Sequence, residues 1–162
     1  MTRWIRFFGN LDGRIARKTF WLASLAIVAA EIVAMFVAGF LVIALTLADR
    51  NIKSMIVPAI LAVTVPFLYA KFVIAVKRAH DRNIPLWIIA GLYAAAIARE
   101  VLIYFGWLQR HPWTQLFSTK GFVSFVITIL VGVVGLALLV ELGFRKGKPG
   151  PNRFGPDPLM RA

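Results

Sequence analysis

The chain has 162 residues, of which 60% are hydrophobic and only 16% are charged. Soluble domains of this length carry more charge, so the composition excludes an ordinary soluble globular protein. The net charge of +12 suggests nucleic-acid binding at first sight, but Lys and Arg also accumulate in the cytoplasmic loops of membrane proteins. We therefore expect a membrane protein with no nucleic-acid partner.

Four long apolar stretches occupy most of the chain, at residues 20–47, 55–76, 86–108 and 121–144. Each is long enough to cross a bilayer, since about 20 apolar residues in an α-helix span a hydrocarbon layer of roughly 30 Å. The sequence predicts an all-α polytopic membrane protein with four transmembrane helices in a small bundle.

The soluble segments are too short to fold alone, so residues 1–162 form a single membrane domain in this interpretation. We divide that domain into an interfacial basic arm at 1–18, a four-helix bundle at 19–144 and a basic, Gly/Pro-rich cytoplasmic tail at 145–162. The tail cannot be helical and is expected to lie extended against the inner face.

Lys and Arg are distributed unequally between the two sides of the predicted membrane. If the chain starts inside, the inner segments hold 13 of them and the outer segments hold 4, which predicts cytoplasmic N and C termini in a bacterial inner membrane. The chain has no cysteine, which excludes disulfides and thiolate chemistry. We expect no cofactor.

Small residues recur at helical spacing in three of the spans, and in the third they are Gly91, Ala95 and Ala98. The first span carries Ala26, Ala30, Ala34 and Ala38, and the last span carries Gly121, Ser124, Thr128, Gly132 and Gly135. Such faces allow membrane helices to approach closely. They fit packing within the bundle, and they also fit the seam of a homo-oligomer. Within the second span, Pro66 predicts a kink.

Three ionisable residues, Glu31, Arg99 and Glu100, lie at a similar depth, roughly 18–21 Å from the inner side at about 1.5 Å per residue. A lone charge at that depth is costly. We predict that Glu31 pairs with Arg99 between the first and third helices, because Arg99 and Glu100 point about 100° apart. The group is either a proton or ion relay or a structural ion pair. If the third helix is short, Arg99 instead extends to the outer surface.

Two further ionisable residues in the spans, Lys71 and Glu141, are interpreted as interfacial anchors. The long stem of Lys71 allows its ammonium group to reach the interface. Glu141 precedes Arg145 by four residues, which is the favourable order for an ion pair on a helix.

Three local sequences on the inner side carry polar motifs. The matched residues are Gly13, Arg14, Arg17, Phe20 and Trp21, then Arg78, His80 and Asp81, then Asn152, Arg153, Phe154, Gly155, Pro156 and Pro158. With these motifs in this order, the chain resembles the domain of unknown function 805 family of small bacterial inner-membrane proteins. The resemblance covers nearly the whole chain, implies the same topology and supplies no activity.

The inner motifs admit three interpretations. In the first they form a structural clasp, in which Asp81 holds Arg14 or Arg17 and Asn152 bonds backbone groups at a helix end. In the second, an anion site for lipid headgroups or an acidic partner is built from Arg14, Arg17, Arg78 and Arg153. In the third, His80 acts as an acid or base beside Asp81.

The catalytic interpretation lacks support, because no serine or cysteine nucleophile stands in an evident motif. His111 is predicted on the opposite side of the membrane from His80, so the two cannot share a metal, and we expect no metal site.

Three functions follow from these features. The leading hypothesis is a non-enzymatic membrane protein whose basic cytoplasmic face binds anionic lipid headgroups or a protein partner. The alternative is a subunit of a small oligomeric transporter or channel that uses Glu31, Arg99 and Glu100. A third is a lipid-acting enzyme that uses His80.

Overall fold

A computed structural model describes residues 7–48 and 56–160 of the chain. The element order is α2 (Arg17–Ala48), α3 (Ile56–Asp81), α4 (Leu86–Tyr104), the short 3-10 helix η2 (Pro112–Gln115) and α5 (Thr119–Gly143). Within these ranges there is no β-strand, and the four long helices are each long and apolar enough to cross a membrane. The predicted fold class is therefore confirmed.

The third span ends earlier than the apolar pattern predicts. Apolar residues continue to Leu108, but α4 ends at Tyr104 because Gly106 adopts a left-handed conformation with φ of +73°. The amide of Trp107 donates to the carbonyl of Leu102, and the amide of Gly106 donates to that of Ile103. This pair of bonds is the Schellman pattern that satisfies the last carbonyls of a helix.

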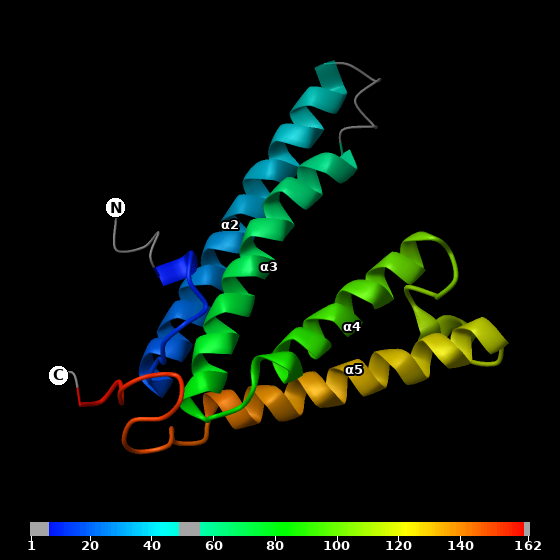
Figure 1. Ribbon diagram of the computed structural model, residues 1–162. Coiled ribbons are helices and arrows are strands. Elements are labelled where there is room, and N and C mark those ends of the chain that lie inside the picture. The colour runs from blue at the N-terminus through cyan, green and yellow to red at the C-terminus, as the bar shows by residue number, and fades with distance from the viewer. Residues whose placement is uncertain (1–6, 49–55, 161–162) are drawn as a thin grey trace.

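The helices form two antiparallel hairpins, α2–α3 and α4–α5, which meet at one end and diverge toward the other (Figure 1). We call the meeting point the junction: the starts of α2 and α4, the ends of α3 and α5, and the flanking residues 9–16, 82–85 and 144–158. The buried apolar cluster lies there and consists of Ile15, Phe20, Ile74, Val76, Ala79, Ile89 and Leu142. Among the described residues, the buried apolar cluster that joins the two hairpins therefore lies at the junction.

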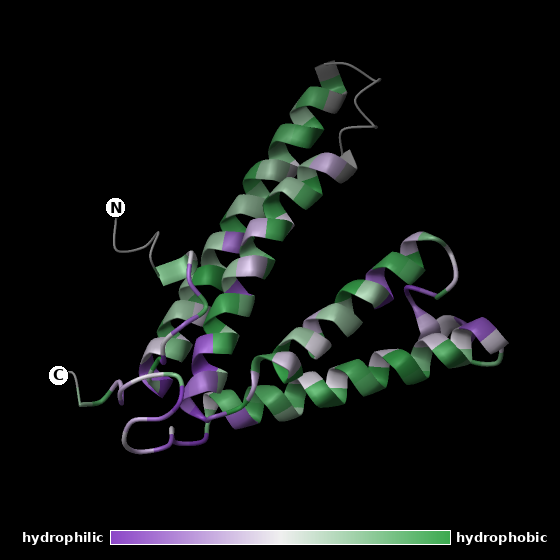
Figure 2. Cartoon of the chain, in the orientation of Figure 1, coloured by the Kyte–Doolittle hydropathy of each residue, from purple (hydrophilic) through white to green (hydrophobic). Residues whose placement is uncertain are grey.

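Beyond the junction, large apolar side chains face outward. Phe36 and Phe40 of α2 are 76% and 73% exposed. Figure 2 shows hydrophobic colour along most of each helix, with hydrophilic residues at the junction, at the far end of the α4–α5 hairpin and part-way along α2 and α3. Exposed apolar surface on this scale is unstable in water and stable in lipid. The helices are thus built for a hydrocarbon solvent.

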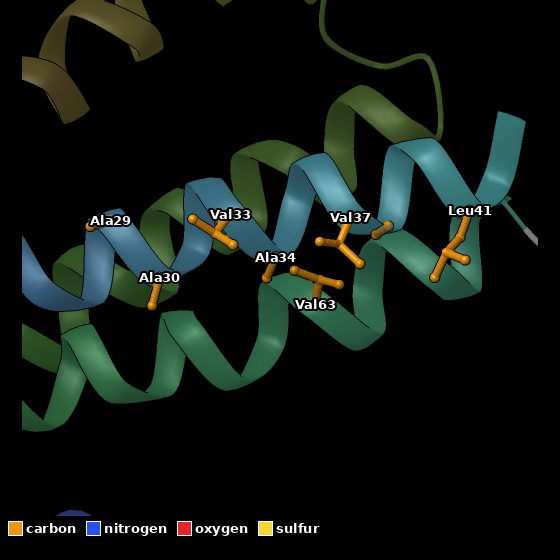
Figure 3. A pocket seen from close by; sticks show the side chains of 8 residues that line it. Ala29, Ala30, Val33, Ala34, Val37, Leu41 and Val63 are labelled. Carbon is orange, nitrogen blue, oxygen red and sulfur yellow. The ribbon is translucent and has the colours of Figure 1, made fainter.

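The small-residue faces are used only in part for packing within the chain. Ala30 and Ala34 of α2 point toward α3, where Val63 faces them (Figure 3). Gly121 lies so close to the backbone of Gln115 that an added Cβ would be 1.8 Å from its carbonyl oxygen. A Cβ added at Gly132 or at Gly135 would meet nothing within 4 Å.

Both terminal segments lie at the junction. Residues 7–16 run along the α2–α3 hairpin before α2 begins, and the tail after α5 folds back across the ends of α2 and α3 (Figure 1). The segment 145–160 contains no helix, as predicted, and it forms a series of turns. The two motifs nearest the chain ends are in this way brought beside the motif that ends α3.

Candidate functional site

The centre of the junction is the carboxylate of Asp81, the last residue of α3, which is 2% exposed. Its Oδ1 accepts from Nε and Nη2 of Arg14 at 3.1 and 2.9 Å. Its Oδ2 accepts from Nη1 of Arg78. The two arginine side chains are 1% and 0% exposed, so one buried carboxylate holds two buried guanidinium groups.

The remaining donors of Arg14 hold the tail. Its Nη1 donates to the carbonyl of Gly150 at 2.7 Å and to that of Gly155 at 3.3 Å, and its Nη2 donates to that of Lys148 at 2.6 Å. The amide of Lys148 donates in turn to the Asp81 carbonyl at 3.0 Å. Arg14 therefore joins the segment before α2, the end of α3 and the tail.

The end of α5 is capped by side chains from the other hairpin. The last carbonyls of a helix lack partners within the helix and carry its partial negative charge. Five consecutive carbonyls, from 142 to 146, accept such bonds: Leu142 and Arg145 from Arg78, Gly143 from Trp21, Phe144 from Arg17, and Lys146 from Arg82. Motif residues of α2 and α3, together with Arg82 of the segment after α3, thus fasten the two hairpins together.

The tail motif closes over His80. Nδ2 of Asn152 donates to the His80 carbonyl at 2.9 Å, and Oδ1 of Asn152 accepts from the amide of Phe154 at 2.9 Å. The Phe154 ring then stacks on the imidazole, with centroids 3.8 Å apart and planes at 5°. Nδ1 of His80 faces the carbonyl of Gly13 at 3.3 Å. His80 is only 5% exposed and is covered on the side of the tail.

Six of the seven predicted inner-face residues come together at the junction: Arg14, Arg17, Arg78, His80, Asp81 and Asn152. The seventh, Arg153, lies at the edge with its guanidinium 4.6 Å from the centre of the Phe154 ring. The contacts have the form of the clasp, with Asp81 holding Arg14. The anion-site interpretation needs a different set of residues, because Arg14 and Arg78 are buried and already bonded.

A second set of cations, missed by the sequence analysis apart from Arg17, lines a pocket of about 520 Å³ beside the clasp. Arg17, Lys18, Lys146 and Lys148 contribute to its wall, together with the carboxylates of Asp81 and Asp157. All four cationic residues are exposed. Their sequence signal is modest, since lysines at helix ends are common in membrane proteins.

Asp157 was also missed, and it shapes the tail. Its Oδ2 accepts from the amide of Gly150 and its Oδ1 from that of Leu159, both at 2.9 Å. These backbone donors hold the pKa of the Asp157 carboxyl below its usual range. The Asp-Pro-Leu sequence was the available signal, because an aspartate often bonds the amide two residues on.

The prediction for the membrane-depth charges is wrong. Glu31 pairs with Lys71 of α3, its neighbour in the same hairpin, and not with Arg99. Lys71 is therefore a partner in an ion pair and not an interfacial anchor. The reason is the divergence of the hairpins, which carries Arg99 on α4 away from α2 (Figure 1).

Arg99 is bound within its own hairpin. Its Nε donates to Oγ1 of Thr128 on α5 at 3.0 Å, and its Nη1 donates to Glu100. The expectation that these adjacent residues satisfy each other poorly is also wrong, since the flexible side chains overcome the angle between them. Among the residues proposed for a transport path, Glu31 therefore does not share a site with Arg99 and Glu100.

The expected pair of Glu141 and Arg145 is confirmed, at 2.9 Å between Nη1 of the arginine and Oε2 of the glutamate. Glu141 also accepts from Arg82, the residue that follows α3, at 2.6 Å. It therefore contributes to the contact between hairpins in addition to its role on α5.

Comparison with known protein families identifies the family of this chain. The family described as protein of unknown function (DUF805) matches residues 8–156, which is nearly the whole sequence. The chain belongs to the DUF805 family. No curated protein and no solved structure matches it. The clasp residues of this DUF805 protein, from Arg14 to Asn152, all lie inside the matched region.

Proposed function

We propose that this DUF805 protein is a multi-pass protein of the bacterial inner membrane with both termini and the junction on the cytoplasmic side. The four apolar helices support membrane insertion. The excess of Lys and Arg in the segments at the junction end supports the orientation, because such residues stay on the cytoplasmic side during insertion.

We further propose a non-enzymatic role, in which the cationic pocket binds the anionic headgroups of membrane lipids. The observation that carries the proposal is the convergence of Arg17, Lys18, Lys146 and Lys148 on one exposed pocket. Among the described residues, none of these four is paired with a carboxylate; Arg17 donates only to the carbonyl of Phe144. Each such cation gains about 1 kcal/mol near an anionic leaflet.

The carboxylates in the pocket do not oppose this function. Asp81 is held between two buried guanidinium groups, so the trio of Asp81, Arg14 and Arg78 is net positive. Asp157 accepts two backbone amides. A ligand would therefore meet the positive charge of the four flexible side chains, and the fixed trio of Asp81, Arg14 and Arg78 beneath them adds a net positive charge.

The test uses native mass spectrometry of the purified full chain with dioleoyl-phosphatidylglycerol or dioleoyl-phosphatidylcholine. The unsubstituted protein is expected to retain the anionic lipid several-fold better, and K18Q/K146Q/K148Q to lose that preference. Lys120→Gln is the matched control, because Lys120 is exposed at the far end of α5. An unchanged preference in the triple variant refutes the proposal.

A further inference from the structure

A groove on the membrane side of the junction lies next to the cationic pocket. It has a volume of about 860 Å³ and runs along the α2–α3 hairpin, with Thr19, Ala26 and Ala30 of α2 on one side and Pro66 of α3 on the other. The rings of Phe7 and Phe8 form a further wall. Nearly all of the lining side chains are apolar, and the volume lies in the usual range of ligand sites.

The aromatic wall is fixed in place by contacts with α3. The hydroxyl of Tyr69 donates to the carbonyl of Phe8 at 2.9 Å. The two phenylalanine rings pack edge to face, with centroids 5.1 Å apart, and the ammonium of Lys77 lies 4.4 Å from the centre of the Phe7 ring. The segment before α2 therefore folds beside the hairpin at a defined position and encloses a groove that two helices alone do not make.

The groove has a polar end and an apolar end. Its lining begins at Thr19, adjacent to Lys18 of the cationic pocket, and continues to Ala30, about 16 Å farther along α2 at 1.5 Å per residue. Beyond Ala30 a shallower hollow continues along the same hairpin past Val37 to Leu41 (Figure 3). The groove thus runs in the same direction as a lipid acyl chain, which extends from its headgroup toward the middle of the bilayer.

We propose that this groove holds an acyl chain of a single phospholipid whose anionic headgroup occupies the cationic pocket. The inference deepens the proposed function, on which the headgroup assignment rests. The occupant follows from charge complementarity: Lys18 of the cationic pocket directly precedes Thr19 at one end of the groove, and the apolar trough leads away from it along α2. A helix from a second copy would place a row of side chains along the trough and bring no anion to its mouth.

The experiment fills the groove and measures lipid retention by native mass spectrometry with the same two dioleoyl lipids. Ala26→Phe places a ring in the trough from an exposed position, and Ala70→Leu fills it from the α3 side. We expect each variant to retain both lipids less well. For Ala26→Phe the loss of affinity should be about tenfold, which corresponds to roughly two methylene groups of the acyl chain that are no longer buried. Ala44→Phe, exposed on α2 away from the groove, is the matched control and should retain lipid normally.

The outcomes separate the two proposals. If the groove variants lose both lipids and keep the preference for phosphatidylglycerol, the acyl-chain site is supported. If the unsubstituted protein shows no headgroup preference but Ala26→Phe still weakens retention, the proposed function fails and the chain site stands. Unchanged retention in both groove variants overturns the inference, and so does a dimeric unsubstituted protein that Ala26→Phe converts to a monomer without lipid loss.

Discussion

At the junction Arg78 is 0% exposed and sits among other charged groups, whereas half-way along α2 the apolar side chain of Phe36 is 76% exposed. This is the reverse of burial in a soluble domain. Where the chain leaves the bilayer, charged groups are enclosed and bonded to carbonyls. Where it crosses the bilayer, lipid replaces the core. The comparison teaches that this fold is held together by a polar junction and that its helices are free to diverge beyond it.

The strongest test of this comparison is Asp81→Asn. The substitution keeps the shape of the side chain but leaves the guanidinium groups of Arg14 and Arg78 without their shared counter-charge. We expect a loss of about 3–5 kcal/mol in the free energy of unfolding, as for other broken buried ion pairs. Reversible denaturation in detergent micelles measures it.

Glu100→Gln is the control for Asp81→Asn, because the Glu100 side chain is 54% exposed in the outer half of the α4–α5 hairpin. Its loss should cost no more than about 1 kcal/mol. Equal effects of the two substitutions would contradict a junction-centred fold.

Gly147→Ala tests the close approach of the tail to the clasp. An added Cβ would lie 2.0 Å from Oδ2 of Asp81, so either the tail or the carboxylate must move. We expect a destabilisation of about 1–3 kcal/mol and faster proteolysis of the tail. In the lipid-facing part of α5, Gly132→Ala meets nothing within 4 Å and should instead be neutral or stabilising by about 0.5–1 kcal/mol. Equal effects of Gly147→Ala and Gly132→Ala on the free energy of unfolding would contradict the contrast between the junction and the lipid-facing helices.

Double-mutant cycles can distinguish the ion pair of Glu31 with Lys71 inside the first hairpin from the pair with Arg99 that the sequence predicts between hairpins. A double-mutant cycle with Glu31→Gln and Lys71→Gln should give a coupling energy of about 0.5–3 kcal/mol, since the two side chains are in direct contact. The cycle that combines Glu31→Gln with Arg99→Gln should give none. Coupling in the second cycle would show that the hairpins come together in the membrane.

The smallest expected effect concerns the tail and pH. The amides of Gly150 and Leu159 lower the pKa of Asp157, so its bonds are complete above the ordinary pKa of aspartate and are lost as the pH falls through the lowered value. Hydrogen exchange should show protection of these two amides that decreases only at acidic pH. Asp157→Asn should remove this pH dependence, and protection that persists in acid would argue against the role of Asp157.

The sequence predicted which residues form the candidate site, but it did not predict which of their side chains are accessible to solvent. Motif spacing identified Arg14, Arg78, Asp81 and Asn152, and the pairing of Arg14 with Asp81 was one of the stated alternatives. The sequence could not show that these arginines are enclosed, because their partners are mostly backbone carbonyls at the end of α5 and in the tail. Backbone acceptors carry no sequence signal. The exposed Lys146 and Lys148 were missed for a different reason, since lysines near helix ends are common in membrane proteins.

The sequence alone determined the four membrane-crossing helices, because burial in hydrocarbon depends on the length and apolarity of each segment by itself. It also determined which residues stand at the junction ends of those helices. Only the tertiary structure decided that the hairpins diverge, that Glu31 pairs with Lys71, and that residues before α2 enclose a groove. These features depend on contacts between segments far apart in the chain, and helix periodicity constrains such contacts only weakly.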